Sequence, residues 1–386
     1  AQAGNSGNPY QLIGTYSLDN NLQAGRSLAS YTNRLPLTDL KNELKTSIEV
    51  GADIRLFNNR GGIDFTYYDA STRNQIIPID ISPSTGFATR VINAGEIRNH
   101  GFEVLLNATP IQFTNGFRWD VSFNYTRNYS EVVELAPGVQ RFFISNDRNV
   151  ALYADPGEPY GTMYANSARW LRDGNGNRMI DPDGLPIREL GLFPIGNVLP
   201  QWLGGLTNTF SYKNLSLSTL VDIRQGGLIF SMSNVIEAIH GTSKRTLPGR
   251  EAGLIAEGVK ATKNADGTWS STGEANDIPV SAENYWNRAV PGSTTAVAEE
   301  FVNDASYVAM REINLSYRLP PALLSKTPFS NISLSLVGRN LFYFSRHTDG
   351  FAPEAASFNA NNTGLGFESS SLPFTRQIGF NLNLGL

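Results

Sequence analysis

Hydrophobic and polar residues alternate with a period of two along most of this chain. In the segment Thr46–Phe57, apolar residues occupy every second position, and polar residues such as Glu49 and Asp53 fall between them. Successive side chains of a β-strand point to opposite faces, so such a segment has one apolar and one polar face. The same period recurs in Ile63–Tyr68, Trp119–Thr126, Leu215–Arg224, Glu312–Leu319 and Ile332–Arg339. The pattern predicts an all-β protein.

The last segment, Thr375–Leu386, alternates apolar residues with glycine and asparagine from Ile378 onward. A strand of this kind suits a wall with lipid on one side and water on the other. The mean hydropathy is −0.24, and no stretch approaches the roughly 18 apolar residues of a membrane-spanning helix. A membrane β-barrel needs only half-apolar strands, and the 11% aromatic content would suit bands at two membrane interfaces. The sequence therefore favours a transmembrane antiparallel β-barrel.

The connections between these strands fall into two length classes that alternate along the chain. The short ones are Asn58–Gly61, Thr114–Gly116, Lys213–Asn214 and Pro320–Asn331, and the long ones are Ser71–Ala94, Ala136–Gln201, Gln225–Ser306 and Arg346–Pro373. Bacterial outer-membrane barrels have short periplasmic turns and long extracellular loops, so the C-terminus is predicted to be periplasmic. A strand at Gly161–Arg172 would require a second one beside it to keep this alternation.

The strand count bears on closure of the barrel. With Pro9–Leu18 as the first strand, the pattern gives about nine to eleven strands. An open sheet in a bilayer would leave unpaired N–H and C=O groups at two edges, and each such group costs several kcal/mol. Either these strands close into a small barrel, or they complete a larger one.

Composition excludes several classes of protein. The net charge is −4 without basic blocks, so nucleic acid is not an expected partner. Cysteine is absent, which excludes disulfides and cysteine metal sites in this chain. No G-x-S-x-G elbow is present, so no enzyme and no cofactor are predicted. Residues 1–7 do not resemble a signal peptide, which an exported protein needs, so we expect that the true beginning of the protein is missing.

Six motifs occur in a fixed order along the chain. They are LKNELKTSIEVGADIRLFNNR at residues 40–60, IDFTYYD at 63–69, INAGEIRNHGFE at 92–103, GEPYG at 157–161, DASYVAMREINLSY at 304–317 and GRNLF at 338–342. Together they resemble the C-terminal part of the SusC/RagA branch of TonB-dependent outer-membrane transporters. Two departures are Leu386, where the family usually ends in an aromatic residue, and Asn42, where the family has proline.

The resemblance implies a 22-stranded barrel with an N-terminal plug and a TonB-contacting segment. Residues 1–386 are then expected to be the C-terminal portion of the barrel, without the plug and the N-terminal strands. The implied function is import of oligosaccharides or peptides across the outer membrane of a Gram-negative bacterium. The implied partners are the rest of the barrel with its plug, a SusD-like surface lipoprotein, TonB and outer-membrane lipids. The alternatives are a porin-like barrel that works without TonB and a soluble β-sandwich binding module.

Charged residues on the polar strand faces are candidates for the lumen. Arg or Lys at mid-depth on a lipid-facing surface costs about 2–4 kcal/mol, and Asp or Glu less, so these residues are predicted to face inward. Most of them are expected to form a solvated wall that contacts the plug, and the alternative is a substrate path. The candidates are Glu49, Asp53, Arg55, Asp64, Glu103, Asp120, Asp222, Arg224, Glu312, Arg318 and Arg339.

The long connections carry aromatic residues among amides and hydroxyls, a combination that suits recognition of sugars or peptides or of a partner protein. These ligand or partner candidates are Trp269, Tyr285, Trp286, Phe351, Phe358 and Phe367.

A weak calcium candidate consists of Asp173, Asn175, Asn177 and Asp181. Arg178 stands at the position of the turn glycine and Gly184 at that of the bidentate glutamate, so a plain turn is the favoured interpretation. The three histidines, His100, His240 and His347, lie far apart in sequence, and no metal site is predicted from them.

Overall fold

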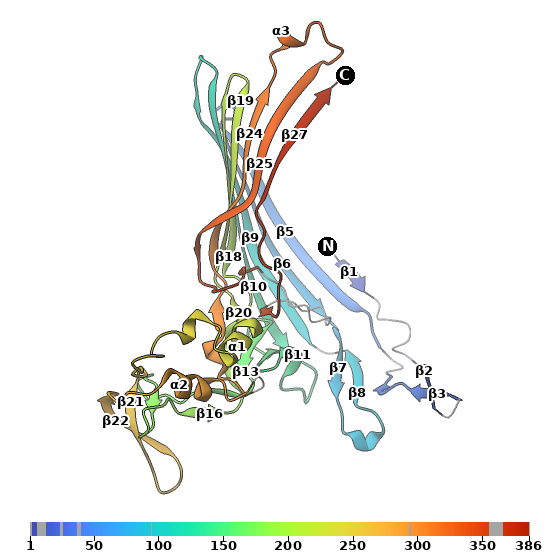
Figure 1. Ribbon diagram of the computed structural model, residues 1–386. Helices are drawn as coiled ribbons and strands as arrows, with labels where there is room; N and C mark the ends of the chain where they lie inside the picture. The colour runs from blue at the N-terminus through green and yellow to red at the C-terminus, as the bar shows by residue number, and fades with distance from the viewer. Residues whose placement is uncertain are drawn as a thin grey trace.

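The computed structural model describes residues 2–5, 13–23, 26–36, 40–93, 95–292, 295–354 and 366–385. Its main element is an antiparallel sheet of ten strands in the order β1-β5-β6-β9-β10-β18-β19-β24-β25-β27 (Figure 1). These strands are β1 Gln2–Asn5, β5 Glu43–Leu56, β6 Gly61–Arg73, β9 Glu96–Gln112, β10 Phe117–Glu134, β18 Trp202–Tyr212, β19 Leu215–Gln225, β24 Tyr307–Arg318, β25 Asn331–Arg346 and β27 Gln377–Gly385. The all-β prediction and the count of nine to eleven strands are confirmed.

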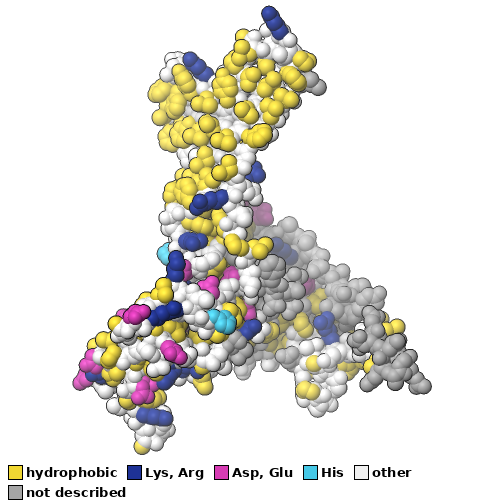
Figure 2. Space-filling model, in the orientation of Figure 1, with side chains coloured by type: hydrophobic (Ala, Val, Ile, Leu, Met, Phe, Trp, Pro, Cys, Tyr) yellow, Lys and Arg dark blue, Asp and Glu magenta, His cyan; other side chains and the backbone are white. Residues whose placement is uncertain are grey.

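The register divides the sheet into an apolar face and a polar face, because cross-strand partners share a face. One row on the apolar face runs across eight strands and is Ile54, Ile63, Leu106, Phe123, Leu206, Val221, Met310 and Phe342. The adjacent row lies on the polar face and is Arg55, Gly62, Asn107, Ser122, Thr207, Leu220, Glu312, Arg339 and Gln377. The apolar face is uncovered, and Phe380 on β27 is 80% exposed. Figure 2 shows hydrophobic side chains over the upper part of the sheet and most charged ones below.

Aromatic side chains form two bands on the apolar face. Near the short connections, the rings of Trp119 and Phe210 stack at 5.7 Å. Near the long connections, Tyr125 stacks on Trp202 at 5.3 Å and on Phe102 at 5.6 Å. Trp119 and Tyr125 are six residues apart on β10, which is about 20 Å along a strand. Two such bands flank the apolar zone of outer-membrane barrels.

Asn208 is a polar residue on the apolar face, and the Trp119 indole N–H donates to its side-chain oxygen at 3.2 Å. Trp119→Phe keeps the ring and removes the donor, so we expect it to lower the free energy of unfolding by about 1–2 kcal/mol. The measurement is urea unfolding of the full-length protein from lipid vesicles. In an Asn208→Leu background the same substitution should be nearly neutral, and an equal loss in both backgrounds would contradict a role for this hydrogen bond.

The two edges of the sheet lack strand partners over most of their length. Strand β1 pairs only with Glu43–Thr46 of β5, and the rest of β5 has no second partner among the described strands. Strand β27 pairs with β25 alone, so within the described residues the sheet does not close on itself. The last strand pairs with β25 as far as Gly385, and Leu386 lies outside the described residues.

The predicted first strand, Pro9–Leu18, is wrong. Residues 9–12 lie outside the described part of the chain, and Tyr16 to Leu18 begin β2 (Tyr16–Gln23), which pairs with β3 (Arg26–Tyr31). This hairpin joins residues that are close in sequence and is separate from the ten-stranded sheet, whose edge is β1 instead. Period-two patterning identified a strand here but not its partner.

The alternation of short and long connections is confirmed. The short ones, including the segment with helix α3 (Pro321–Leu324), lie at one end of the strands, at the top of Figure 1. Gly385 of β27 pairs with Asn331, so the last strand ends on the side of the short connections. In the β5–β6 turn, Asn58 and Asn59 have positive φ angles of 52° and 66°. Asparagine tolerates this region better than most residues, which accounts for the Asn-Asn pair.

At the opposite end of the strands, three of the long connections form a folded unit, here called the loop domain, from residues 135–201, 226–292, 295–306, 347–354 and 366–376. It contains helices α1 (Met232–Ile239) and α2 (Ala282–Ala289) and the short helices η3 (Lys244–Thr246) and η4 (Ala298–Glu300). Its strands are β11 Phe142–Asp147, β12 Val150–Ala154, β13 Thr162–Ala165, β14 Ala168–Trp170, β15 Met179–Ile180, β16 Arg188–Leu190, β17 Phe193–Asn197, β20 Leu228–Ser231, β21 Val259–Lys263, β22 Trp269–Ala275, β23 Val302–Asp304 and β26 Phe367–Glu368.

The remaining long connection, between β6 and β9, forms a separate hairpin of β7 (Ile76–Asp80), η2 (Pro83–Thr85) and β8 (Thr89–Asn93). Strand β4 (Arg34–Leu35) pairs with β8 of this hairpin. The segment Gly161–Arg172 forms two short strands, β13 and β14, within the loop domain and none in the main sheet. The parity of the main sheet is therefore kept. No helix among the described residues is long and apolar enough to cross a membrane.

One hydrophobic core holds the loop domain together. It includes the fully buried Trp170, Phe230 and Phe301 and draws residues from three of the long connections. Parallel pairing of β20 with β26, where Phe230 is opposite Phe367, joins segments that are 137 residues apart. The long connections therefore form a packed domain.

Candidate functional site

All eleven charged residues predicted to face inward lie on the polar face of the ten-stranded sheet. Their cross-strand rows alternate with the apolar rows, and Asp53, Asp64 and Asp222 share one row. Whether this face lines a lumen stays a prediction.

Ion pairs hold several of these residues in place. Asp53 pairs with Arg55 at 2.8 Å, and Glu312 with Arg339 at 2.8 Å. Arg224 instead donates to the backbone oxygen of Val198 at 3.0 Å, which ties the wall to the loop domain.

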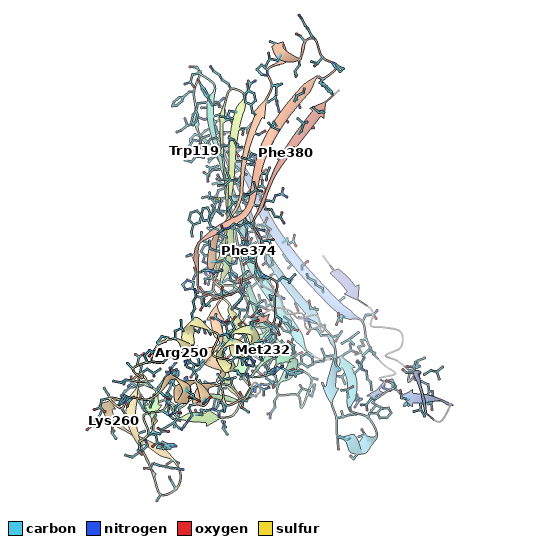
Figure 3. All side chains as sticks on the ribbon, in the orientation of Figure 1. Trp119, Met232, Arg250, Lys260, Phe374 and Phe380 are labelled. Atoms are coloured by element: carbon cyan, nitrogen blue, oxygen red, sulfur yellow. The ribbon has the colours of Figure 1, made fainter. Side chains whose placement is uncertain are left out.

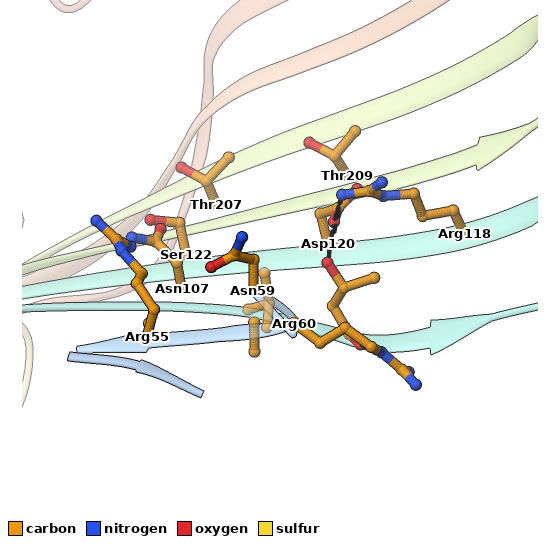
Figure 4. Close-up of a pocket in the computed structure, with 13 residues that line it drawn as sticks. Arg55, Asn59, Arg60, Asn107, Arg118, Asp120, Ser122, Thr207 and Thr209 are labelled. Atoms are coloured by element: carbon orange, nitrogen blue, oxygen red, sulfur yellow. Dashed lines mark hydrogen bonds and ion pairs between the residues drawn. The ribbon is translucent and has the colours of Figure 1, made fainter. Parts of the chain in front are cut away.

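A pocket of about 260 Å³ lies on the polar face near the short connections, across β5, β6, β9, β10 and β18 (Figure 4). Arg118 pairs with Asp120 at 2.6 Å, and the Thr109 hydroxyl donates to the same carboxylate at 2.6 Å. Arg60 donates to the backbone oxygens of Thr109 and Pro110. Three arginines, Arg55, Arg60 and Arg118, and one carboxylate therefore line this surface, here called the strand pocket, and make it basic.

Arg118 and Arg60 were not among the predicted site residues. Arg118 has the same parity as Asp120 in the alternation of β10, and this signal could have identified it. Arg60 follows the β5–β6 turn, where alternation carries no information.

Arg311 is a third residue that the pattern did not identify, and it bridges two carboxylates at the wall. Its guanidinium lies 2.9 Å from Asp222 of β19 and 2.6 Å from Glu354 of the last long connection. Tyr307 donates to Asp222 at 2.9 Å, and Tyr343 donates to Glu354 at 3.0 Å. The cluster fixes the entrance of the last long connection against the wall.

The predicted ligand-contacting aromatic residues separate into buried and accessible ones. Phe351 and Phe367 are buried in hydrophobic clusters, so they do not contact a ligand as predicted. Tyr285 packs against Trp170 and Trp286, and burial raises the pKa of its hydroxyl to about 12. Phe358 lies outside the described residues.

Trp269 on hairpin β21–β22 is half-buried against a small cluster of Met179, Ile187 and Ala261, and the Lys263 ammonium lies 5.9 Å from the centre of its ring. Trp286 is half-buried and lines a pocket of about 520 Å³ between α1 and α2, in the region where Figure 3 labels Arg250 and Met232. This α1–α2 pocket presents an indole beside a guanidinium (Arg250), an imidazole (His240), an amide (Asn287) and a carboxylate (Glu283). An aromatic wall with a few polar groups is the usual composition of a small-molecule site.

The calcium candidate is occupied by turn hydrogen bonds. Asp173 accepts from the backbone N–H groups of Asn175 and Asn177, both at 2.9 Å, and hydrogen bonds to Asn177 hold the pKa of Asp173 below its ordinary value. Asp181 accepts two N–H groups of its own turn and pairs with Arg288 at 3.1 Å. Among the described residues, no three His, Asp or Glu side chains form a metal-binding group. The turn interpretation accounts for both carboxylates, and calcium binding stays an unsupported prediction.

Asp147 at the end of β11 is buried, and its Oδ2 has no hydrogen-bond partner among the described residues. Burial raises the pKa of this carboxyl, which outweighs the lowering effect of the Arg148 charge, and nearby Glu368 adds to the rise. The folded state therefore favours the protonated form, so stability falls as pH rises from the ordinary pKa through the folded one. We expect Asp147→Asn to stabilise the loop domain at pH 7 by about 1–2 kcal/mol and to have no such effect near pH 3.

The measurement for Asp147→Asn is hydrogen exchange in β11 and β12 of the full-length protein, corrected for intrinsic rates at each pH. Asp183→Asn is the control, because Asp183 is exposed in a turn of the same domain. Equal exchange in wild type and Asp147→Asn at pH 7 would contradict the inferred burial of a charge.

Comparisons with known proteins agree with this architecture. Residues 1–226 match the family described as TonB dependent receptor-like, beta-barrel. The chain is 27% identical to TonB-dependent receptor P3 of Formosa agariphila, over 91% of this chain and 35% of that protein. It is 30% identical to TonB-dependent receptor SusC of Bacteroides thetaiotaomicron, over 47% of this chain and 19% of that protein.

The fold is similar to a solved structure of the RagAB peptide transporter, with a TM-score of 0.70 at 18% identity, covering 99% of this chain and 39% of that one. The chain spans 35% of the length of TonB-dependent receptor P3 and 39% of the length of TonB-dependent receptor P26 of the same organism. Proteins of this family are transporters and receptors of the outer membrane and not enzymes. The chain therefore belongs to the TonB-dependent receptor-like β-barrel family and is SusC/RagA-like within it.

Proposed function

We propose that this chain is part of an importer that takes up oligosaccharides or peptides across the outer membrane, with a SusD-like surface lipoprotein as its lid and TonB as its energy source. One observation carries the proposal: a two-faced sheet, apolar between two aromatic bands and polar on the other side, has three of its four long connections folded into one domain at one end of its strands. Such a sheet separates lipid from an aqueous passage, and the loop domain lies at the mouth of that passage.

The unpaired edges support a larger barrel. In hydrocarbon each free N–H or C=O costs several kcal/mol, so β5 and β27 are expected to pair with further strands. We infer that residues 1–386 supply the C-terminal wall of a 22-stranded barrel whose N-terminal strands and plug complete it. The basic strand pocket lies at the end of the strands where the short connections are. It is a suitable contact for acidic groups of the plug.

The α1–α2 pocket supports ligand contact by the loop domain. An indole can stack on the apolar face of a sugar or on a peptide side chain, while Arg250 and Asn287 offer N–H donors to hydroxyl or carbonyl oxygens. The similarity to the RagAB peptide transporter favours peptides as one class, and the indole in the pocket keeps oligosaccharides as the other.

Uptake by intact cells tests the function. Fluorescent oligosaccharides and peptides are offered to the native strain, to a strain without this gene and to a strain without TonB. We expect uptake of one class to be lost in both deletion strains and a surface lipoprotein to copurify with the tagged full-length protein. Uptake that survives without TonB would support the porin-like alternative, and recovery of the protein without detergent would support the soluble one.

Sidedness is tested by labelling with a membrane-impermeant maleimide. This chain has no cysteine, so introduced cysteines in it give a clean signal. Ala265→Cys, at the exposed tip of hairpin β21–β22, should react on intact cells. Lys326→Cys, in the exposed connection after α3, should react only after the outer membrane is disrupted. The opposite pattern would place the C-terminus outside the cell.

A further inference from the structure

Arg127 lies on the apolar face of the sheet, in the half of β10 nearer the long connections. The register pairs it with Phe102 of β9, and Tyr125 and Tyr129 share its face because they are two residues away on the same strand. Its guanidinium lies 4.6 Å from the centre of the Tyr129 ring. A cation therefore lies over an aromatic ring, on the face of the sheet that is mainly apolar.

The surroundings of Arg127 are aromatic. Its neighbour Tyr125 stacks on Phe102 and on Trp202, and Tyr129 stacks on His100 at 5.2 Å. These rings form the aromatic band near the long connections, which corresponds to the depth of lipid headgroups in outer-membrane barrels. Figure 2 shows Lys and Arg side chains next to the hydrophobic zone, where the sheet meets the loop domain.

Two carboxylates on this part of the face are engaged by other arginines, while Glu131, four residues from Arg127 on the same strand, forms no ion pair among the described residues. Asp69 is bound by Arg98, and Glu96 is bound by Arg73 at 3.0 Å. Among the described residues, Arg127 has no carboxylate within ion-pair distance. Its donors are therefore available to an anion from outside the chain.

We propose that Arg127, with Tyr129 beneath it, binds a phosphate group of an outer-leaflet lipid. The proposal rests on the proposed function, because it places the long connections outside the cell. A guanidinium binds phosphate through two parallel hydrogen bonds, and an arginine near the membrane interface costs only about 0–1 kcal/mol. The surrounding rings favour a lipid over free phosphate, since they offer apolar contact to the acyl chains of the same molecule.

The test is lipid binding to the detergent-purified full-length protein, followed by native mass spectrometry. The probes are bisphosphorylated lipid A and the same lipid after removal of both phosphates. We expect Arg127→Gln to weaken binding of the phosphorylated probe about fivefold, the usual contribution of one basic residue at an anionic surface. Arg127→Lys should retain most of the affinity. Arg339→Gln, on the polar face, should bind like wild type, and all four proteins should bind the dephosphorylated probe equally.

Three outcomes overturn the proposal. Arg127→Gln could bind the phosphorylated probe as tightly as wild type, or it could lose both probes equally, which would assign the effect to the aromatic rings. Displacement of the lipid by an equal concentration of inorganic phosphate would identify a site for free phosphate instead. The labelling of Ala265→Cys tests a different claim, the sidedness of the barrel. If the sidedness were reversed, Arg127 would still discriminate the two probes in detergent, and only the membrane leaflet of the bound lipid would change.

Discussion

Trp170→Ala should unfold the loop domain more readily while leaving the ten-stranded sheet intact. Trp170 is fully buried at the centre of the loop-domain core. Its indole N–H donates to Glu300 at 2.6 Å, and Glu299 accepts from its backbone N–H at 2.8 Å. Truncation of a buried tryptophan typically costs about 3–5 kcal/mol, because it leaves a cavity and removes the burial of a large ring. We expect a loss of this size in the free energy of opening of the loop domain.

Hydrogen exchange of the full-length protein in detergent measures this loss for each element separately. Strands β12 and β13, which belong to the same core, should exchange faster, and β18 and β19 of the main sheet should not change. Trp269→Ala is the control, because this half-buried tryptophan packs against a separate small cluster of Met179, Ile187 and Ala261, and it should leave the exchange of β12 and β13 unchanged. Uniform protection of β12 and β13 in Trp170→Ala would show that the core does not act as a unit.

The main sheet could be predicted from the sequence because its physical cause is local. Each strand separates two different environments, so a period of two reports directly which side is apolar. Ile378 and Phe380 were therefore placed correctly with no knowledge of their neighbours. The parity of the connections likewise followed from the lengths of the segments between strands.

The loop domain could not be predicted in this way, since its structure depends on contacts between distant segments. Trp170 bonds to residues 129 and 130 positions away. Many of its strands have only two to five residues, too few to show a period. Phe351 and Phe367 were interpreted as ligand contacts because an aromatic residue in a long connection looks the same whether it is exposed or packed. Only the pairing of β20 with β26 shows that Phe367 belongs to the core.

Arg311 was missed for a more specific reason. Alternation along β24 assigns residue 311 to the apolar set, together with Ile313. The register shifts between Met310 and Glu312, and this β-bulge turns the Arg311 side chain toward Asp222 on the polar face. Bulges re-aim side chains in this manner. An arginine in an apolar set is the one local sign of such an irregularity, and it points to the residue with the strongest ionic contacts in the wall.

Arg311→Met should destabilise the junction between the wall and the last long connection by about 2–3 kcal/mol. The substitution leaves Asp222 and Glu354 without their shared cation, and Tyr307 and Tyr343 cannot replace its charge. Breaking a fully buried pair typically costs about 3–5 kcal/mol. The estimate is lower here because the Asp222 and Glu354 side chains are 36% and 31% exposed, while Arg311 is 17% exposed. Urea unfolding of the full-length protein and hydrogen exchange at residues 351–354 measure the effect.

Arg339→Met, on the neighbouring strand β25, provides the matched control. Arg339 pairs with Glu312 at 2.8 Å, as short as the contacts of Arg311, but its side chain is 60% exposed. Water screens such a pair, so the substitution should cost no more than about 1 kcal/mol. Glu354→Gln should add little once Arg311 is methionine, because its partner is already gone. If Arg311→Met and Arg339→Met lower the free energy of unfolding equally, the Arg311 contacts are ordinary surface ion pairs. If the effects of Arg311→Met and Glu354→Gln are additive, the two residues do not act together.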